Sequence, residues 1–280
     1  MKKKCLIYVV AFNHEKFILK TLKRIPKTLN KKYNIEILVA DDHSEDDTTY
    51  IAKKFKPGKF KYKIHLHKKN QGYGGNQKIG YFYAIKNSFD YVVLLHGDGQ
   101  YAPEYLPKIL KLLENKNYAA VFGSRMIKKI SALKGGMPYY KFAGNIILSI
   151  IQNFLLNSKM SEFHSGYRSY KVKYLKKIFF EMNSDNYCFD TEIIIQLILS
   201  KFKIKEISIP TFYGDEISYV NGLKYAIQII VQTIKGKLHN LNLINEKKFQ
   251  MINNDIANKL KKKYSNIIKK RLRCVKQIKI

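Results

Sequence analysis

The chain has 280 residues, 46% of them hydrophobic, and its 52 Lys and Arg outnumber its 21 Asp and Glu to give a formal net charge of +31. This length suits one large domain or two small ones, and 21 Tyr and 16 Phe exclude disorder over most of the chain. The three cysteines are too far apart for a disulfide framework or a metal cluster, and no run approaches the ~18 apolar residues of a membrane-spanning helix. We therefore expect a reduced, cytoplasmic protein.

The first 125 residues alternate between short β-rich runs and stretches with apolar residues at helical spacing. Strands are predicted at residues 6–12, 35–40, 62–67, 91–95 and 118–122, and helices at 14–25, 45–55, 75–87 and 103–114. This alternation is typical of a mostly parallel sheet with helices on both faces. Ligands of such sheets bind at the carboxyl ends of the strands, so we look for the site there.

Beyond residue 125 the pattern predicts helices at 143–156, 171–182, 191–202 and 223–234, and a strand at 204–209. Residues 247–280 carry twelve basic residues and one acid, with apolar residues such as Ile252, Val275 and Ile278 at helical spacing. We therefore divide the chain into an α/β domain, residues 1–240, and a basic amphipathic helical tail, residues 241–280. Such a helix can lie on an anionic membrane; the alternative is a solvated lysine-rich face.

Polar residues follow four of the predicted strands in turn. They are Asn13 to Glu15, Asp41 to Ser44, Asn70 to Gly75 and His96 to Gln100. Each group alone has a structural explanation, as helix caps or as tight turns. Helix capping explains one residue per loop, however, and not carboxylates or amides in all four loops.

The chemistry of these groups fits a nucleoside diphosphate held with Mg²⁺ or Mn²⁺. Asp98, flanked by His96 and Gln100, offers a few ligands to a hard cation and leaves the remaining positions for phosphates. Asp42 can accept hydrogen bonds from a nucleobase or a ribose. Gly72 and its neighbours can direct backbone N–H groups toward phosphate at a helix start.

An ordered set of motifs resembles family 2 glycosyltransferases, above all the branch of dolichol-phosphate mannose synthase and the polyprenyl-phosphate glycosyltransferases. The resemblance extends over roughly residues 4–215. The motifs are AFNHE (11–15), VADDHS (39–44), NQGYG (70–74), HGDGQYAPE (96–104), GSR (123–125), SGYR (165–168) and FDTE (189–192).

The resemblance implies a GT-A fold over residues 1–240 and an inverting, metal-dependent transfer from a nucleotide-diphosphate sugar to a polyprenyl-phosphate or cell-surface glycan acceptor. The donor would be bound by Ala11, Asn13, Glu15, Asp42, Asn70, Gly72 and Arg125. The metal, Mg²⁺ or Mn²⁺, would be bound by Asp98, Gln100 and His96. The catalytic group would be Asp98, Glu162 and Arg168, with Arg125 and Arg168 facing phosphates.

Two residues depart from the family pattern. His96 stands where the metal motif usually has Asp, which favours weaker binding or Mn²⁺, because imidazole is a softer ligand. Glu162 stands where this branch often has Asp, and it is a candidate base or orienting group. A phosphate acceptor is already ionised and needs only charge balance from arginine, whereas a sugar hydroxyl needs a carboxylate to remove its proton.

Two further segments carry hypotheses. Asp190 and Glu192 open a helix, where capping and dipole pairing explain them, and a role at the acceptor is the alternative. Residues 213–222 are polar and contain glycine, which predicts a lid.

Two functions other than a glycosyltransferase are also possible from the sequence. They are a nucleic-acid-binding protein that uses the positive charge and a nucleotidyltransferase. Only five of the 52 basic residues are arginine, and the first strand is followed by no glycine-rich loop, so we rank both lower and expect no nucleic-acid partner.

Overall fold

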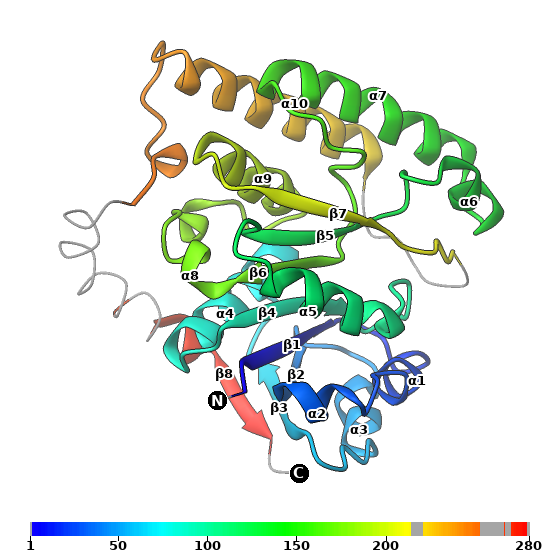
Figure 1. Ribbon diagram of the computed structural model, residues 1–280. Coiled ribbons are helices and arrows are strands. Elements are labelled where there is room, and N and C mark those ends of the chain that lie inside the picture. Colours follow the sequence, from blue (N-terminus) through cyan, green and yellow to red (C-terminus); the bar gives the residue numbers. More distant parts are fainter. Residues whose placement is uncertain (1, 214–220, 253–265, 267–269, 279–280) are drawn as a thin grey trace.

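The computed structural model describes residues 2–213, 221–252, 266 and 270–278 (Figure 1). Within them one sheet has the strand order β7-β5-β6-β4-β1-β2-β3-β8. The strands are β1 (Lys4–Ala11), β2 (Asn34–Asp41), β3 (Lys61–His67), β4 (Tyr91–His96), β5 (Ala120–Ser124), β6 (Arg168–Lys171), β7 (Ile204–Ser208) and β8 (Val275–Ile278). The α-helices are α1 (Ile18–Lys23), α2 (Leu29–Lys32), α3 (Thr48–Lys53), α4 (Tyr73–Lys86), α5 (Leu106–Glu114), α6 (Lys129–Lys134), α7 (Tyr139–Leu156), α8 (Val172–Leu175), α9 (Phe189–Leu199) and α10 (Gly222–Asn240). The 3-10 helices are η1 (Pro103–Tyr105), η2 (Phe180–Met182) and η3 (Lys247–Phe249).

The sheet is mixed and mostly parallel, which confirms the predicted fold class. Strand β1 pairs in parallel with β2 and β4, β2 pairs with β3, and β5 pairs with β7. Strand β6 runs antiparallel between β4 and β5, and β8 runs antiparallel beside β3. The parallel strands β4, β1, β2 and β3 bring their carboxyl ends to one edge, and the four polar motifs follow them there.

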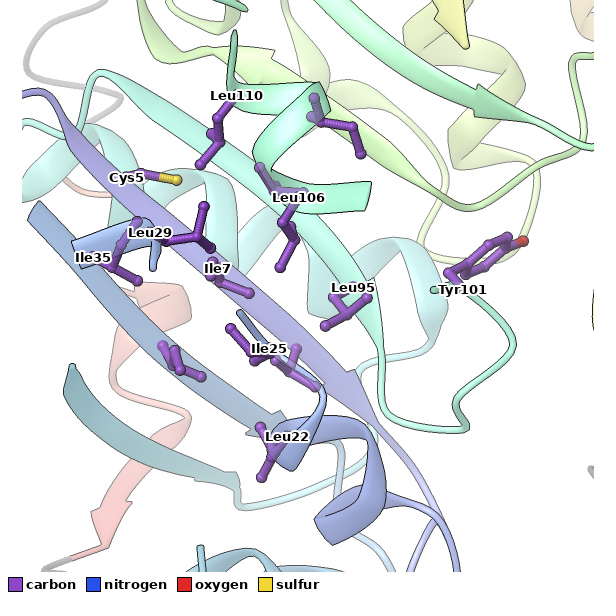
Figure 2. Close-up of a cluster of buried hydrophobic side chains, with 14 of the residues drawn as sticks. Cys5, Ile7, Leu22, Ile25, Leu29, Ile35, Leu95, Tyr101, Leu106 and Leu110 are labelled. Atoms are coloured by element: carbon purple, nitrogen blue, oxygen red, sulfur yellow. The ribbon is translucent and has the colours of Figure 1, made fainter. Parts of the chain in front are cut away.

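Helices cover both faces of the sheet, so strand β1 reads as a continuous apolar run. Its odd-numbered residues, such as Cys5 and Ile7, pack with Leu22, Leu106 and Leu110 from α1 and α5 (Figure 2). Its even-numbered residues pack against α4 and α9 in a second cluster. Burial on both faces gives the strand ends a rigid position, which in turn positions the loops of the site.

The prediction of one helix over residues 171–182 is wrong in its length, and the strand before it was not predicted. Residues Arg168–Lys171 form β6, and the helix α8 that follows spans only Val172–Leu175. All four residues of β6 are buried, and Val92 and Ala120 flank Tyr170 from the two neighbouring strands. The short strand lacks an apolar alternation, because polar side chains occupy buried positions inside the sheet.

The predicted tail helix is wrong at its end, where Val275 and Ile278 lie in β8 at the edge of the sheet. Before this strand, Phe249 and Ile252 are buried. Residues 253–265 and 267–269 of the predicted helix lie outside the described residues, as do residues 214–220 of the lid predicted over 213–222. In the part of the chain that the structure describes, no helix combines the length and the apolar composition needed to cross a bilayer.

Candidate active site

The loops after β1 and β2 are joined by hydrogen bonds between the predicted donor-binding residues and the neighbouring loop. Asn13, whose φ is 56°, donates its backbone N–H to Ser44 Oγ at 2.9 Å and accepts from the N–H of Glu45 at 2.9 Å. Glu15 accepts from the N–H of Asp47 at 3.0 Å. The two loops therefore form one preorganised wall of the site.

Asp42 lies at the base of that wall and is buried. The carbonyl of Ala11, the last residue of β1, accepts from the Asp42 N–H at 2.9 Å. The Oδ1 atom of Asp42 accepts from the Gln71 N–H at 2.8 Å and lies 2.8 Å from His67 Nδ1. These contacts fix the carboxyl group between the second and third strand ends, where it was predicted to contact a nucleoside.

The glycine loop is bound to protein and not directed at an open phosphate position. The N–H groups of Gly74 and Gly75 donate to the carbonyl of Asp185 at 2.8 and 3.2 Å, and Gly72 N–H donates to Asn70 Oδ1 at 2.8 Å. Gly72 has φ of +76°, and a Cβ there would lie 2.6 Å from Asp185 O. The expectation that these N–H groups face phosphate is therefore corrected, because a backbone carbonyl already accepts from two of them.

The turn after β4 brings the three predicted metal ligands together. His96 Nδ1 lies 3.9 Å from Asp98 Oδ2, with the two side chains 15% and 13% exposed. The backbone N–H of Gln100 donates to Asp98 Oδ1 at 3.0 Å. No cluster of three or more His, Cys, Asp or Glu able to hold a metal occurs among the described residues. One carboxylate and one imidazole fit a divalent cation that takes its other ligands from substrate phosphates.

A chain of hydrogen bonds behind this turn orients the imidazole of His96. The hydroxyl of Tyr73 donates to Asp190 Oδ2 at 2.9 Å and lies 3.3 Å from His96 Nε2. Gln77 Nε2 donates to the other oxygen of Asp190 at 3.0 Å. Because the Tyr73 hydroxyl donates its proton to Asp190, it can only accept from His96. This favours the ring tautomer with its proton on Nε2 and an unprotonated Nδ1 on the side of Asp98.

Burial lowers the pKa of His96 to about 4, so its imidazole is neutral at neutral pH. Only a neutral imidazole has a lone pair to give to a metal ion. Asp190 lies in the first turn of α9, whose N-cap residue is Cys188. The capping part of the explanation for Asp190 is therefore wrong, since its carboxylate accepts from Tyr73 and Gln77 and the N-cap position makes no side-chain hydrogen bond. Its place in the first turn agrees with dipole pairing.

Arg125 and Glu162 form a buried ion pair on the other side of the turn. The Arg125 backbone N–H donates to Glu162 Oε2 at 2.7 Å, and its Nε donates to Oε1 at 2.9 Å. Asn145 donates to the same Oε1 at 2.8 Å, while Arg125 also donates to Tyr213 Oη and to the His164 carbonyl, both at 3.1 Å. Burial alone would raise the pKa of Glu162, but the charge and hydrogen bonds of Arg125 outweigh it and lower the pKa.

Arg168 is completely buried. Its Nη2 donates to the carbonyl of Phe163 at 2.6 Å, and its guanidinium lies 4.4 Å from the ring centre of Phe122. Its Nε and Nη1 have no hydrogen-bond partner among the described residues. In this conformation the Arg168 guanidinium is buried in the protein, and its positive charge contributes to lowering the pKa of His96.

Sequence reasoning assigned no role to several residues that shape the site. Tyr73 was part of a quoted motif, but its contact with His96 depends on α4 and α9 packing together. Gly166 packs against the imidazole, since a Cβ there would lie 2.6 Å from His96 Nε2. Tyr101 accepts from the Gly166 N–H at 2.7 Å and packs edge-on against His96.

The chain was compared with known families and proteins. The model of Glycosyl transferase family 2 matches residues 6–179. An uncharacterized protein of Methanocaldococcus jannaschii is 33% identical over 81% of this chain and 96% of its own length. The UDP-N-acetylglucosamine–dolichyl-phosphate N-acetylglucosaminyltransferase of Methanococcus voltae is 29% identical over 75% of this chain and 87% of its own length. Glucosyl-3-phosphoglycerate synthase of Mycobacterium tuberculosis, crystallised with UDP, has a TM-score of 0.60 at 13% identity over 88% of this chain and 82% of that chain.

Proposed function

The chain belongs to glycosyl transferase family 2, and we propose that it transfers a sugar from a nucleotide-diphosphate sugar to the phosphate of a polyprenyl-phosphate acceptor, with inversion at the anomeric carbon. Its class as a glycosyltransferase with a nucleotide-sugar donor follows from the family, and the predicted GT-A fold is confirmed. The acceptor, the stereochemistry and the metal are proposals. The M. voltae relative, whose name includes dolichyl phosphate, supports this choice of acceptor.

The observation that supports a phosphate acceptor is the hydrogen bonding of Glu162, the candidate base. Both of its oxygens accept hydrogen bonds from Arg125, and Oε1 also accepts from Asn145. A carboxylate with a lowered pKa and occupied oxygens is a poor proton acceptor. This favours the orienting role of Glu162 and an acceptor that arrives already ionised, as a phosphate does.

Different residues at the sheet edge would bind different parts of the donor. We assign the nucleoside to the wall that contains Asn13 and Asp42, and the diphosphate to the turn that contains Asp98. When bound, a divalent cation supplies positive charge against the leaving diphosphate; Asp98 and His96 would hold it. The Gln100 N–H would hold the Asp98 carboxylate in place, while Glu162 keeps the guanidinium of Arg125 in one orientation.

The cell-surface glycan acceptor remains the second choice, because its hydroxyl would need a base other than Glu162. For nucleic acid, the arginines offer little support. Arg24 is bonded to Glu104, Arg125 to Glu162 and Arg271 to Asp185, and Arg168 is buried. Proteins that read nucleic-acid sequence rely strongly on arginine forks at their surface.

The proposed function is tested by replacing Asp98 and measuring both binding and transfer. A thermal-shift screen of nucleoside-diphosphate sugars with Mn²⁺ or Mg²⁺ identifies the donor, since a ligand stabilises by RT ln(1 + [L]/Kd). With that donor and polyprenyl phosphate, we expect Asp98→Asn to lower turnover by about a hundredfold or more, from loss of charge at the diphosphate. The matched control is Asp90→Asn, at the amino end of β4, which should retain turnover. Turnover retained in Asp98→Asn would contradict the role of Asp98.

A further inference from the structure

Helix α7 (Tyr139–Leu156) has its polar residues inside and its apolar residues outside. Asn145, Ser149 and Gln152 are buried, whereas Ile150 is 62% exposed and Phe154 is 83% exposed. A surface helix of a water-soluble domain shows the reverse arrangement. The outer side of α7 is therefore built to meet an apolar surface and not water.

Helix α10 (Gly222–Asn240) lies beside α7 at one end of the molecule (Figure 1). Thr233 and Gly236 are buried, and Gln152 Nε2 donates to Thr233 Oγ1 at 3.5 Å between the helices. The exposed apolar residues of the two helices form what we call the α7–α10 face. They are Tyr139, Tyr140, Ile147, Ile150, Phe154, Leu223, Ile227, Val231 and Ile234. Large apolar side chains exposed in this number on two neighbouring helices mark an interaction site.

Basic residues predominate around the α7–α10 face. Residues 127–161 and 221–245 contain no Asp or Glu. The nearest acids in the sequence are Glu162, Asp215, Glu216 and Glu246, of which Glu162 pairs with Arg125 and Glu246 with Lys235. Lysines lie in α6, in α7 and α10, and in the loops beside them. They are Lys128, Lys129, Lys134, Lys141, Lys159 and Lys224. An apolar surface bordered mainly by lysines is complementary to an anionic, apolar partner.

We propose that the α7–α10 face docks on an anionic lipid bilayer, with its apolar side chains in the boundary between headgroups and acyl chains and its lysines among the headgroups. Helices with this division of residues lie in the plane of the membrane surface, and Tyr139 and Tyr140 suit that depth. A second copy of the chain is a poorer occupant. A two-fold contact would place the lysine-rich rims of two copies against each other.

The face is coupled to the site through two side chains. Asn145 of α7 donates to Glu162, and the hydroxyl of Tyr225 of α10 lies 3.0 Å from His164 Nδ1. Both helices thus contact the segment that continues to Gly166 beside His96. If the acceptor is a polyprenyl phosphate, which rests on the proposed function, docking brings its headgroup to the site. The docking itself requires neither donor nor acceptor.

The absence of tryptophan from the sequence permits a direct test. Phe154→Trp places a single indole on the α7–α10 face, and Tyr50→Trp places one on α3, where Tyr50 is 57% exposed. With vesicles of phosphatidylglycerol and phosphatidylcholine, without donor or acceptor, we expect a blue shift and quenching by brominated lipid for Phe154→Trp alone. An unshifted Phe154→Trp, or an equal response of Tyr50→Trp, would overturn the proposal. A blue shift without lipid that grows with protein concentration, together with dimers in sedimentation, would identify a second copy instead.

Loss of binding distinguishes this face from the tail. In vesicle sedimentation we expect Phe154→Ser to weaken binding about tenfold or more, and Lys159→Gln about fivefold, while Tyr50→Ser leaves binding unchanged. A further variant tests the tail by replacing Lys261, Lys262 and Lys263 together by Gln. If the tail variant loses binding and Phe154→Ser retains it, the tail is the anchor and the proposal is wrong. Since these vesicles contain no acceptor, the result stands whether or not the proposed transfer reaction is correct.

Discussion

At the scale of single residues, Tyr73 connects the metal motif to the interior. Its hydroxyl joins Asp190 to His96 Nε2, and groups that orient a ligand in this way commonly tune metal affinity. We expect Tyr73→Phe to raise the Mn²⁺ concentration for half-maximal transfer by about 10-fold to 100-fold. Direct Mn²⁺ binding measured by electron paramagnetic resonance should weaken in parallel, which a merely structural role would not produce.

The control for this substitution is Tyr174→Phe on α8, which removes a hydroxyl away from the site. It should leave the Mn²⁺ requirement unchanged. The idea that His96 is oriented through Tyr73 fails if Tyr73→Phe loses thermal stability but binds Mn²⁺ as the native chain does.

Glu162 allows its two roles to be separated by one conservative change. Glu162→Gln leaves Arg125 buried without its counter-charge, and breaking a buried pair costs about 3–5 kcal/mol of unfolding free energy. We expect that loss in denaturant titration, together with reduced transfer whose pH profile keeps its shape. A base would instead remove one limb of the profile. Loss of that limb at unchanged stability would assign Glu162 as the base and favour the hydroxyl acceptor.

At the scale of the elements, the long apolar strands were predictable because burial on both faces leaves a simple sequence pattern. The four-residue strands β6 and β8 were not. Arg168–Lys171 forms β6 only because β4 and β5 offer it edges to pair with, and Val275–Ile278 forms β8 only because β3 has an edge. Such pairing is a long-range event, and the local sequences of these two strands do not encode it.

The candidate site, too, was predictable only in part. The strand-end motifs predicted which loops meet, since parallel strands bring their ends together. What each polar group does was less predictable, because the partners come from distant elements. The carbonyl of Asp185 uses the N–H groups of Gly74 and Gly75, and Glu162 holds Arg125. In both contacts the two partners are far apart in the sequence.

Strand β3 gives an element-scale prediction on pH. His65, 5% exposed, has its pKa lowered to about 4, first by burial and then by His67 and Lys63. The unfolded chain therefore binds this proton more readily than the folded chain. Its contribution to stability is complete above about pH 6.5 and is lost as the pH falls toward about 4.

Between pH 7 and pH 5 we expect the native chain to lose about 2 kcal/mol through this residue. The measurement is the free energy of unfolding of the native chain and of His65→Leu at both pH values. The change in unfolding free energy between the two pH values is compared between the two chains. This comparison cancels any change in packing and the contribution of the other buried histidines, which both chains retain. A pH dependence identical in both chains would show that His65 titrates alike in the folded and unfolded states.

At the scale of the whole molecule, the net charge of +31 does not describe one uniform surface. Lysines predominate around the α7–α10 face, whereas some basic residues near the C-terminal end pair with carboxylates of the body. Lys248 Nζ lies 2.8 Å from the buried carboxylate of Glu192. Arg271 lies 3.1 Å from Asp185, the residue whose carbonyl holds the glycine loop. Basic residues that a sequence count assigns to a solvated tail thus contact the body.

These contacts make the predicted division at residue 240 testable. A chain that ends at Glu246 loses Phe249, Ile252 and β8, all of which pack on the body. Phe249→Ala in the full chain should alone lower the free energy of unfolding by about 3–5 kcal/mol, and the shortened chain by more. Gln250→Ala, which removes an amide that donates to the exposed Asn245 at 2.7 Å, is the matched control and should change stability by less than about 1 kcal/mol. If the shortened chain unfolds at the same denaturant concentration as the full chain, residues 241–280 are a separable tail; a large loss makes them part of the catalytic domain, because the sheet then needs β8 and the core needs Phe249.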